Sequence, residues 1–179
     1  MTINFEKTCY IILKNPQNAF QLKHDLLKLK DSNLTYANEV KFLGVILDEH
    51  LNWHAHINFL ANKLCPIAGL LYRVSSCLPI DVLLLIYNSF VNSKLSHCIE
   101  IWGNAPAVYL NKLFLMQKKI IRIINKKPFD YSTSELFQKF KILTISKIYE
   151  LRVLIHAHNI TKTHYYMYNT RNSFCCNIP

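Results

Sequence analysis

The sequence predicts a mainly α-helical α+β fold, in which a small piece with strands precedes a helical bundle. Three observations support this. Only three of the 179 residues are glycine, long segments after residue 52 repeat apolar residues at helical spacing, and short runs of β-forming residues lie before residue 50. Few glycines argue against an all-β fold or a glycine-loop nucleotide site. Hydrophobic residues make up 51% of the chain, which argues against intrinsic disorder.

The first expected strand and helix lie before residue 31. Cys9–Leu13 reads CYIIL and is rich in β-forming residues, which predicts a strand. Asn15 can cap a helix that Pro16 opens, because proline is well tolerated at the first helical position. This helix would place three leucines on one face, namely Leu22, Leu26 and Leu29.

A second strand region is expected before residue 50. Thr35–Tyr36 and Val40–Leu47 are its parts, and Gly44 within it indicates a bulge or a close backbone approach. Two or three short antiparallel strands and one helix cannot bury both faces of a sheet. Residues 1–50 are therefore expected to be the end of a larger sheet.

The rest of the chain is expected to be helical. Asn52 can cap the first helix, whose stripe from Ile57 to Leu71 is unbroken at helical spacing, and Ser132–Glu135 has capping-box spacing. Ile148, Leu151 and Ile155 mark the last helix. The sequence thus divides into residues 1–50, a helical domain at 51–161, and a flexible tail at 162–179. The long helices are expected at Trp53–Val74, Pro79–Lys94, Pro106–Asn125 and Ser146–Thr161.

The chain is basic, with a formal net charge of +10. Such a charge attracts polyanions, and nucleic acid is the commonest partner, although a merely basic surface is the alternative. On the helix at Pro106–Asn125, four cations share one stripe at spacings of i, i+7, i+10 and i+14. They are candidates for phosphate contacts, and the alternative is an ordinary solvated helix face: Lys112, Lys119, Arg122 and Lys126.

Other chemistry receives little support from the sequence. The six cysteines form no C-x-x-C pair, and the His pairs at i, i+2 point apart on a helix, so no metal site is expected. The apolar run Leu78–Val91 is too short to span a membrane. The residues after Met1 are polar and charged, so no signal peptide is expected. An intracellular location, nuclear or cytoplasmic, is the simplest expectation.

Five segments, in order along the chain, carry a family resemblance. They are NFEKT at Asn4–Thr8, KFLGVILDEHLNWHAHI at Lys41–Ile57, LLLIYNSFVNSKLSHCIEIWGNAP at Leu83–Pro106, LFLMQKKIIRII at Leu113–Ile124 and YNTRNSF at Tyr168–Phe174. Together they resemble the end of the palm and the thumb of reverse transcriptases from non-LTR, LINE-type, jockey-like retrotransposons. His97 and Cys98 depart from the family pattern, which usually has Tyr and often Gly there.

The resemblance implies roles for particular residues. The F-L-G-V segment, with Phe42 and Gly44, would lie in the hairpin that grips the primer strand, and Asp48, Trp53 and His56 would fix the corner between palm and thumb. Packing alone is the alternative for Trp53 and His56. The resemblance places Lys7 near the incoming nucleotide, although a solvated lysine is the simpler expectation here.

The resemblance also implies what this chain lacks. The family's F/Y-x-D-D turn, which holds the catalytic metals, would precede Asn4, and no two of the aspartates Asp25, Asp31, Asp48, Asp81 and Asp130 are adjacent. We therefore expect no catalytic residues, no cofactor and no polymerase activity on its own, with Mg²⁺ needed only in the full-length parent enzyme.

The expected function is that of a truncated retrotransposon reverse transcriptase (RNA-directed DNA polymerase) fragment. It would keep weak, non-specific binding to RNA–DNA or DNA duplex. The alternatives are a host-adopted nucleic-acid-binding domain and a protein-interaction domain, with another chain pairing along the exposed palm edge.

Overall fold

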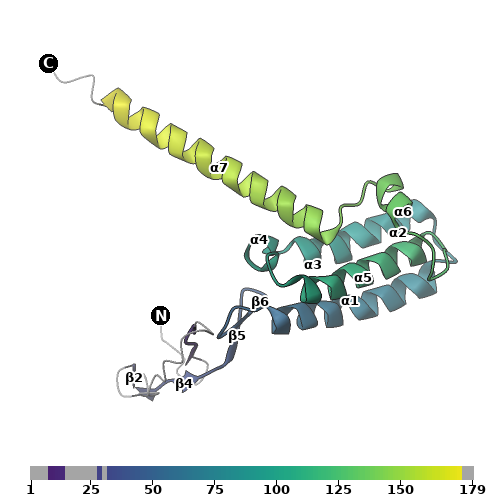
Figure 1. Ribbon diagram of the computed structural model, residues 1–179, viewed down its shortest axis with the longest axis horizontal. Coiled ribbons are helices and arrows are strands. Elements are labelled where there is room, and N and C mark those ends of the chain that lie inside the picture. Colours follow the sequence, from purple (N-terminus) through teal and green to yellow (C-terminus); the bar gives the residue numbers. More distant parts are fainter. Residues whose placement is uncertain (1–7, 15–27, 30–31, 175–179) are drawn as a thin grey trace.

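The computed structural model describes residues 8–14, 28–29 and 32–174 (Figure 1). The described part is mainly helical and carries a few short strands, which confirms the predicted α+β, mainly α class. The strands lie toward the N-terminus and the helices follow them. The division into residues 1–50, 51–161 and 162–179 stays a prediction.

The strands of the described part pair two by two. Cys9–Tyr10 pairs in parallel with Thr35–Tyr36, so the expectation of only antiparallel strands was wrong for this pair. Residues 11–34 connect the two strands and are long enough for the crossover that a parallel pair needs. The bounds are β1 Cys9–Tyr10, β2 Lys28–Leu29, β3 Ser32–Asn33, β4 Thr35–Tyr36, β5 Glu39–Phe42 and β6 Val45–Asp48.

Two sequence predictions in this region need correction. The strand expected at Cys9–Leu13 covers only Cys9–Tyr10. Leu29 was expected on a helix, but it lies in β2, which pairs antiparallel with β3. The rest of that expected helix, from Pro16 to Leu26, lies outside the described residues.

The β5–β6 hairpin is the longest strand pairing described, with Phe42 opposite Val45 and Glu39 opposite Asp48. Leu43 and Gly44 form its turn, and both have positive φ, at 46° and 89°. Positive φ at both central residues matches the twist of a two-residue hairpin. Gly44 therefore makes a turn, and the bulge that we considered at this position is not present.

The helices follow the hairpin in a continuous series. Their bounds are α1 His54–Val74, α2 Ile80–Ile86, a π-helix at Tyr87–Asn92, α3 Ser93–Ser96, α4 Ile99–Trp102, α5 Ala107–Ile124, α6 Ser134–Lys139 and α7 Ile145–Phe174. The expected helix Pro79–Lys94 thus exists, but a π-helical segment interrupts it. The capping box at Ser132–Glu135 does not form, because Thr133 is the N-cap of α6 and makes no side-chain capping bond.

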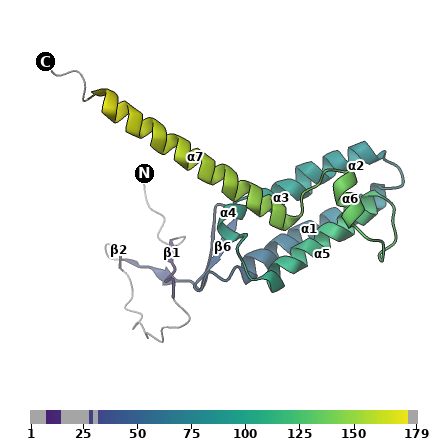
Figure 2. The ribbon, with the colours of Figure 1, turned by 45° about the horizontal axis from the view of Figure 1, so that its top comes forward.

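Helices α1 and α5 lie side by side and form the centre of the bundle, with α2 packed against α5 and the π-helix packed against α1 (Figures 1 and 2). The predicted stripe of α1 is buried apart from the half-buried Ile67, and Leu64 and Leu71 have no exposed surface. It meets the buried face of α5, which includes Leu113, Ile120 and Ile121. This confirms the predicted core of both helices.

Helix α7 extends away from the bundle (Figure 1). Its first turns pack, since Ile145 and Ile148 are buried. Leu151 and Ile155 were expected on the same buried stripe, but they are 46% and 44% exposed. The helix was also expected to end at Thr161, whereas it continues to Phe174. No described helix is both long and apolar enough to cross a membrane.

Candidate nucleic-acid interface

The two central helices carry positive charge without negative charge. Neither the α1 nor the α5 sequence contains Asp or Glu. Both helices present part of their surface to solvent, because each packs on the bundle along only one face. The pair therefore forms a surface of one sign. Its cations are Lys63 and Arg73 in α1, and Lys112, Lys118, Lys119 and Arg122 in α5.

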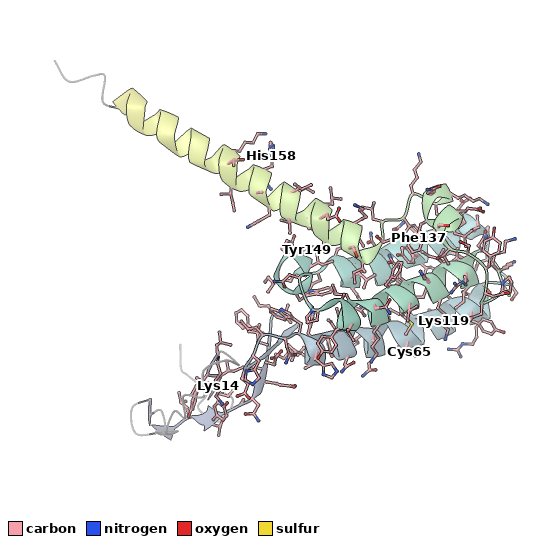
Figure 3. All side chains as sticks on the ribbon, in the orientation of Figure 1. Lys14, Cys65, Lys119, Phe137, Tyr149 and His158 are labelled. Carbon is pink, nitrogen blue, oxygen red and sulfur yellow. The ribbon has the colours of Figure 1, made fainter. Side chains whose placement is uncertain are left out.

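Two of the predicted cations lie along the exposed line where α1 and α5 meet. The Lys112 Nζ donates to the Asn58 Oδ1 of α1 at 2.6 Å. One groove, seven residues further along each helix, is lined by both Cys65 and Lys119 (Figure 3). The equal steps show that α1 and α5 run in the same direction. We call this line the α1/α5 seam: Asn58, Cys65 and Tyr72 from α1, and Lys112 and Lys119 from α5.

Arg122 is tied to the structure more firmly than the two lysines. Its Nε donates to the Tyr131 backbone oxygen at 2.9 Å, and its guanidinium carbon lies 5.3 Å from the centre of the Phe129 ring. It is half-buried and holds the loop after α5. Lys126 is exposed but lies beyond the end of α5 at Ile124, with φ at 51°. The predicted stripe of cations therefore ends where α5 ends, before Lys126.

The candidate residues of the hairpin lie at the other end of α1. Phe42 is 62% exposed beside the turn. A Cβ added to Gly44 would lie 3.2 Å from Nε2 of His97, and that nitrogen is also 3.0 Å from the Leu43 backbone oxygen. The close approach at Gly44 is therefore to a side chain of this chain. Lys7 lies outside the described residues.

Asp48, Trp53 and His56 hold the corner between the hairpin and α1. The buried Asp48 carboxylate accepts backbone N–H bonds from His50, Asn52 and Trp53, at 3.1, 3.2 and 3.0 Å. Trp53 is buried and has φ at 66°, a left-handed conformation that the three bonds help to stabilise. These three bonds occupy the Asp48 carboxylate and give it a structural role in the corner, so its surroundings are not those of a catalytic carboxylate.

His56 completes the corner. Its Nδ1 accepts the Ile46 backbone N–H at 3.3 Å, while its Nε2 is buried with no hydrogen-bond partner. Burial, with a smaller contribution from the nearby His97, lowers the pKa of His56 from 6.5 to about 4. The folded chain therefore requires the neutral imidazole at this position.

We expect stability to fall as the pH falls through the window between about 6.5 and 4. Within it the unfolded chain binds a proton at His56 that the folded chain does not, so stability rises with pH. The loss is at most about 3 kcal/mol. Urea unfolding at pH 7 and pH 4.5 measures it. His56→Asn keeps an acceptor for Ile46 and does not titrate, so an equal pH dependence in this variant would contradict the assignment.

Some exposed residues on α1 and on the segments beside it were not predicted as site residues. Lys41 and Lys63 lie 4.7 and 5.5 Å from the centre of the Phe59 ring. Tyr72 and Phe129 are 71% and 79% exposed beside the Cys65–Lys119 groove. The one signal available in the sequence was Tyr72 itself, a large aromatic residue lying off the apolar stripe of α1.

Metal chemistry finds no support in the described side chains. Across residues 8–14, 28–29 and 32–174, no group of three or more His, Cys, Asp or Glu residues could hold a metal ion. The described cysteines Cys9, Cys65, Cys77 and Cys98 form no disulfide with one another. What this surface offers a ligand is hydrogen-bond donors with positive charge.

No protein-family model matches the chain, and no solved structure matches it. A curated sequence does: over 132 residues the chain is 30% identical to the "RNA-directed DNA polymerase from mobile element jockey" of Drosophila funebris. The match covers 72% of this chain and 14% of that protein. The chain therefore contains a region related to reverse transcriptase, and it spans only a small part of its relative.

Proposed function

We propose that this chain is the palm-end and thumb part of a jockey-like RNA-directed DNA polymerase, and that it holds template–primer duplex through the sugar–phosphate backbone. The observation that supports this best is the pair of parallel helices α1 and α5, which carry Lys and Arg but no Asp or Glu. Cations that contact phosphate position a duplex without reading its sequence. Binding is therefore non-specific and weakens as salt rises, with a Kd of around 10⁻⁶ M or weaker at physiological salt.

The test reverses the two exposed cations of the seam, Lys112→Glu with Lys119→Glu, and leaves Arg122 in place because it holds the loop after α5. We expect binding of RNA–DNA and DNA duplexes to weaken roughly tenfold or more at low salt, equally for all sequences. The slope of log K against log salt should flatten by about 2, since each phosphate contact contributes roughly 0.9. Fluorescence anisotropy of labelled duplexes across a salt series gives both quantities.

The matched control is Lys139→Glu with Lys162→Glu, which changes the net charge equally at exposed positions on α6 and α7. If both double variants weaken binding alike, net charge alone attracts the duplex and the seam has no special role. If the seam variant binds as the parent does at low salt, the α1/α5 surface is an ordinary solvated face and the proposal fails.

We further propose that the chain extends no primer by itself. The Asp48 carboxylate is occupied by three backbone N–H groups, and the sequence contains no adjacent aspartates to hold two metal ions. A primed RNA template incubated with the chain, nucleotides and Mg²⁺ or Mn²⁺ tests this. Template-dependent extension that a point mutation in this chain abolishes would refute it.

A protein partner is a second candidate, favoured by the exposed apolar side chains of α7. Leu154 and Ile160 are 68% and 54% exposed where the helix leaves the bundle. Apolar surface of this kind is typical of an interaction site. A molar mass in solution above that of the monomer, reduced by Leu154→Glu, would support it. Pairing along the strand edge stays a prediction.

A further inference from the structure

One groove opens beside the α1/α5 seam, toward the ends of both helices. Its volume is about 430 Å³, which falls in the range of roughly 300–1,000 Å³ typical of small-ligand sites. No acidic side chain lines it. Its walls come from α1, from α5 and from the loop after α5: Cys65, Ala68, Gly69, Tyr72, Lys119, Arg122, Ile123, Lys127 and Phe129.

The groove combines aromatic and cationic groups. Tyr72 and Phe129 bring rings that are 71% and 79% exposed. The Arg122 guanidinium lies over the Phe129 ring and donates to the Tyr131 backbone oxygen through Nε, so its terminal nitrogens can face an anion. Lys119 and Lys127 add two more cations. A ligand that matches these groups has a flat apolar face and a negative charge.

Gly69 keeps the groove open from the α1 side. A Cβ added to Gly69 would meet no atom within 4 Å. Glycine within a helix usually destabilises it by roughly 0.5–1 kcal/mol relative to alanine. No contact in the bundle requires the small residue here, so the empty space that it leaves is available to a ligand.

We propose that this groove holds an unpaired nucleotide of a single strand that continues from the duplex on the seam. The base would stack on Tyr72 or Phe129, and the phosphates would contact Lys119, Arg122 and Lys127. Exposed aromatic rings beside cations are the usual means of binding single strands without sequence preference. A paired base cannot offer its face in this way, because its neighbours in the duplex cover it. The inference rests on the proposed duplex binding and adds a second nucleic-acid site to it.

The experiment compares three forms of one RNA–DNA duplex by fluorescence anisotropy: blunt, with a short single-stranded extension, and with an abasic extension of equal length. We expect the parent chain to bind the extension with bases about tenfold more tightly than the blunt form, since stacking favours each base. The abasic extension carries the same phosphates and should lose most of this preference.

Gly69→Leu tests the groove without removing a cation. The leucine side chain should fill the empty space, so the tenfold ratio between extended and blunt duplex should fall to about one. Gly69→Ala adds only a Cβ and should keep the ratio. An equal ratio in the parent and in Gly69→Leu, or an abasic extension bound as well as the one with bases, would overturn the proposal.

Two further outcomes separate this proposal from others. If the parent binds blunt duplex but shows no preference for the extension, the groove proposal fails and the duplex proposal stands. If the parent binds no nucleic acid at all, both fail. An acidic, tyrosine-containing peptide that binds the parent but not Gly69→Leu, in the absence of any preference for the extension, would identify the groove as a protein-docking site and overturn the assignment.

Discussion

Gln117→Leu is expected to destabilise the folded chain by roughly 3–6 kcal/mol. The Gln117 side chain has no exposed surface, and its Nε2 donates to the Tyr87 hydroxyl and to the Leu143 backbone oxygen, each at 2.8 Å. Its Oε1 accepts the Ile145 N–H at 3.2 Å. Leucine would leave two buried groups, the Tyr87 hydroxyl and the Ile145 N–H, and the part-buried Leu143 carbonyl without this partner, and each buried group costs about 1–3 kcal/mol. Urea unfolding at neutral pH measures the loss.

A Tyr87→Phe variant distinguishes the loss of the Gln117 hydrogen bonds from general damage to the core. Burial raises the pKa of Tyr87 to about 12, so its hydroxyl is neutral and needs a hydrogen-bond partner. In a Tyr87→Phe background, Gln117→Leu removes one fewer bond, and we expect its cost to fall by about 1 kcal/mol or more. Gln138→Leu, on the exposed surface of α6, should stay within about 0.5 kcal/mol of the parent. An equal cost for Gln117→Leu and Gln138→Leu would contradict the role of Gln117.

Residues such as Gln117 show what the sequence cannot predict. Its partners lie 26 to 30 residues away, and no periodic pattern links them. The buried stripe of α1 was predictable because helical spacing alone places its members on one face. In α7 the same spacing wrongly predicted that Leu151 and Ile155 are buried. A stripe is buried only where another element covers it, and no described element covers α7 beyond its first turns.

The candidate interface was likewise predictable from the sequence only in part. The spacing of seven residues between Lys112 and Lys119 is enough to place them on one side of α5. That α1 lies parallel to α5, with Asn58 and Cys65 beside them, depends on packing between helices and is visible only in the structure. Arg122 shows the limit of charge patterns. The sequence places it on the stripe, but its bond to Tyr131 gives it a structural role.

Backbone conformation makes one departure from the family pattern unfavourable. Cys98 stands where the resembled family often has Gly, and its φ is 50°. This left-handed conformation is more costly for cysteine than for glycine. The segment is nevertheless tied to the core, because Nε1 of the buried Trp102 donates to the His97 backbone oxygen at 2.9 Å.

Gly103→Ala is the second substitution with a large expected effect. Gly103 has an ordinary φ of −70°, so the reason is steric. A Cβ at this position would lie 2.6 Å from the Ile99 backbone oxygen and 2.8 Å from Cγ of Tyr149, and it would overlap Cδ2 of the same ring. Overpacking usually costs about 1–3 kcal/mol. We expect about 3 kcal/mol or more in urea unfolding, because the Ile99 contact is with backbone and cannot rotate away.

The chain supplies its own control, since Gly69 also lies among the helices. Gly69→Ala meets no atom within 4 Å and should stabilise α1 by roughly 0.5–1 kcal/mol. The two Gly→Ala substitutions should therefore change the free energy of unfolding in opposite directions. Tyr149→Ala removes the ring but not the Ile99 oxygen, so in that background Gly103→Ala should cost less by about 1 kcal/mol or more while staying destabilising. Additive effects would show that the Cβ never meets Tyr149, and that α4 and α7 do not pack through Gly103.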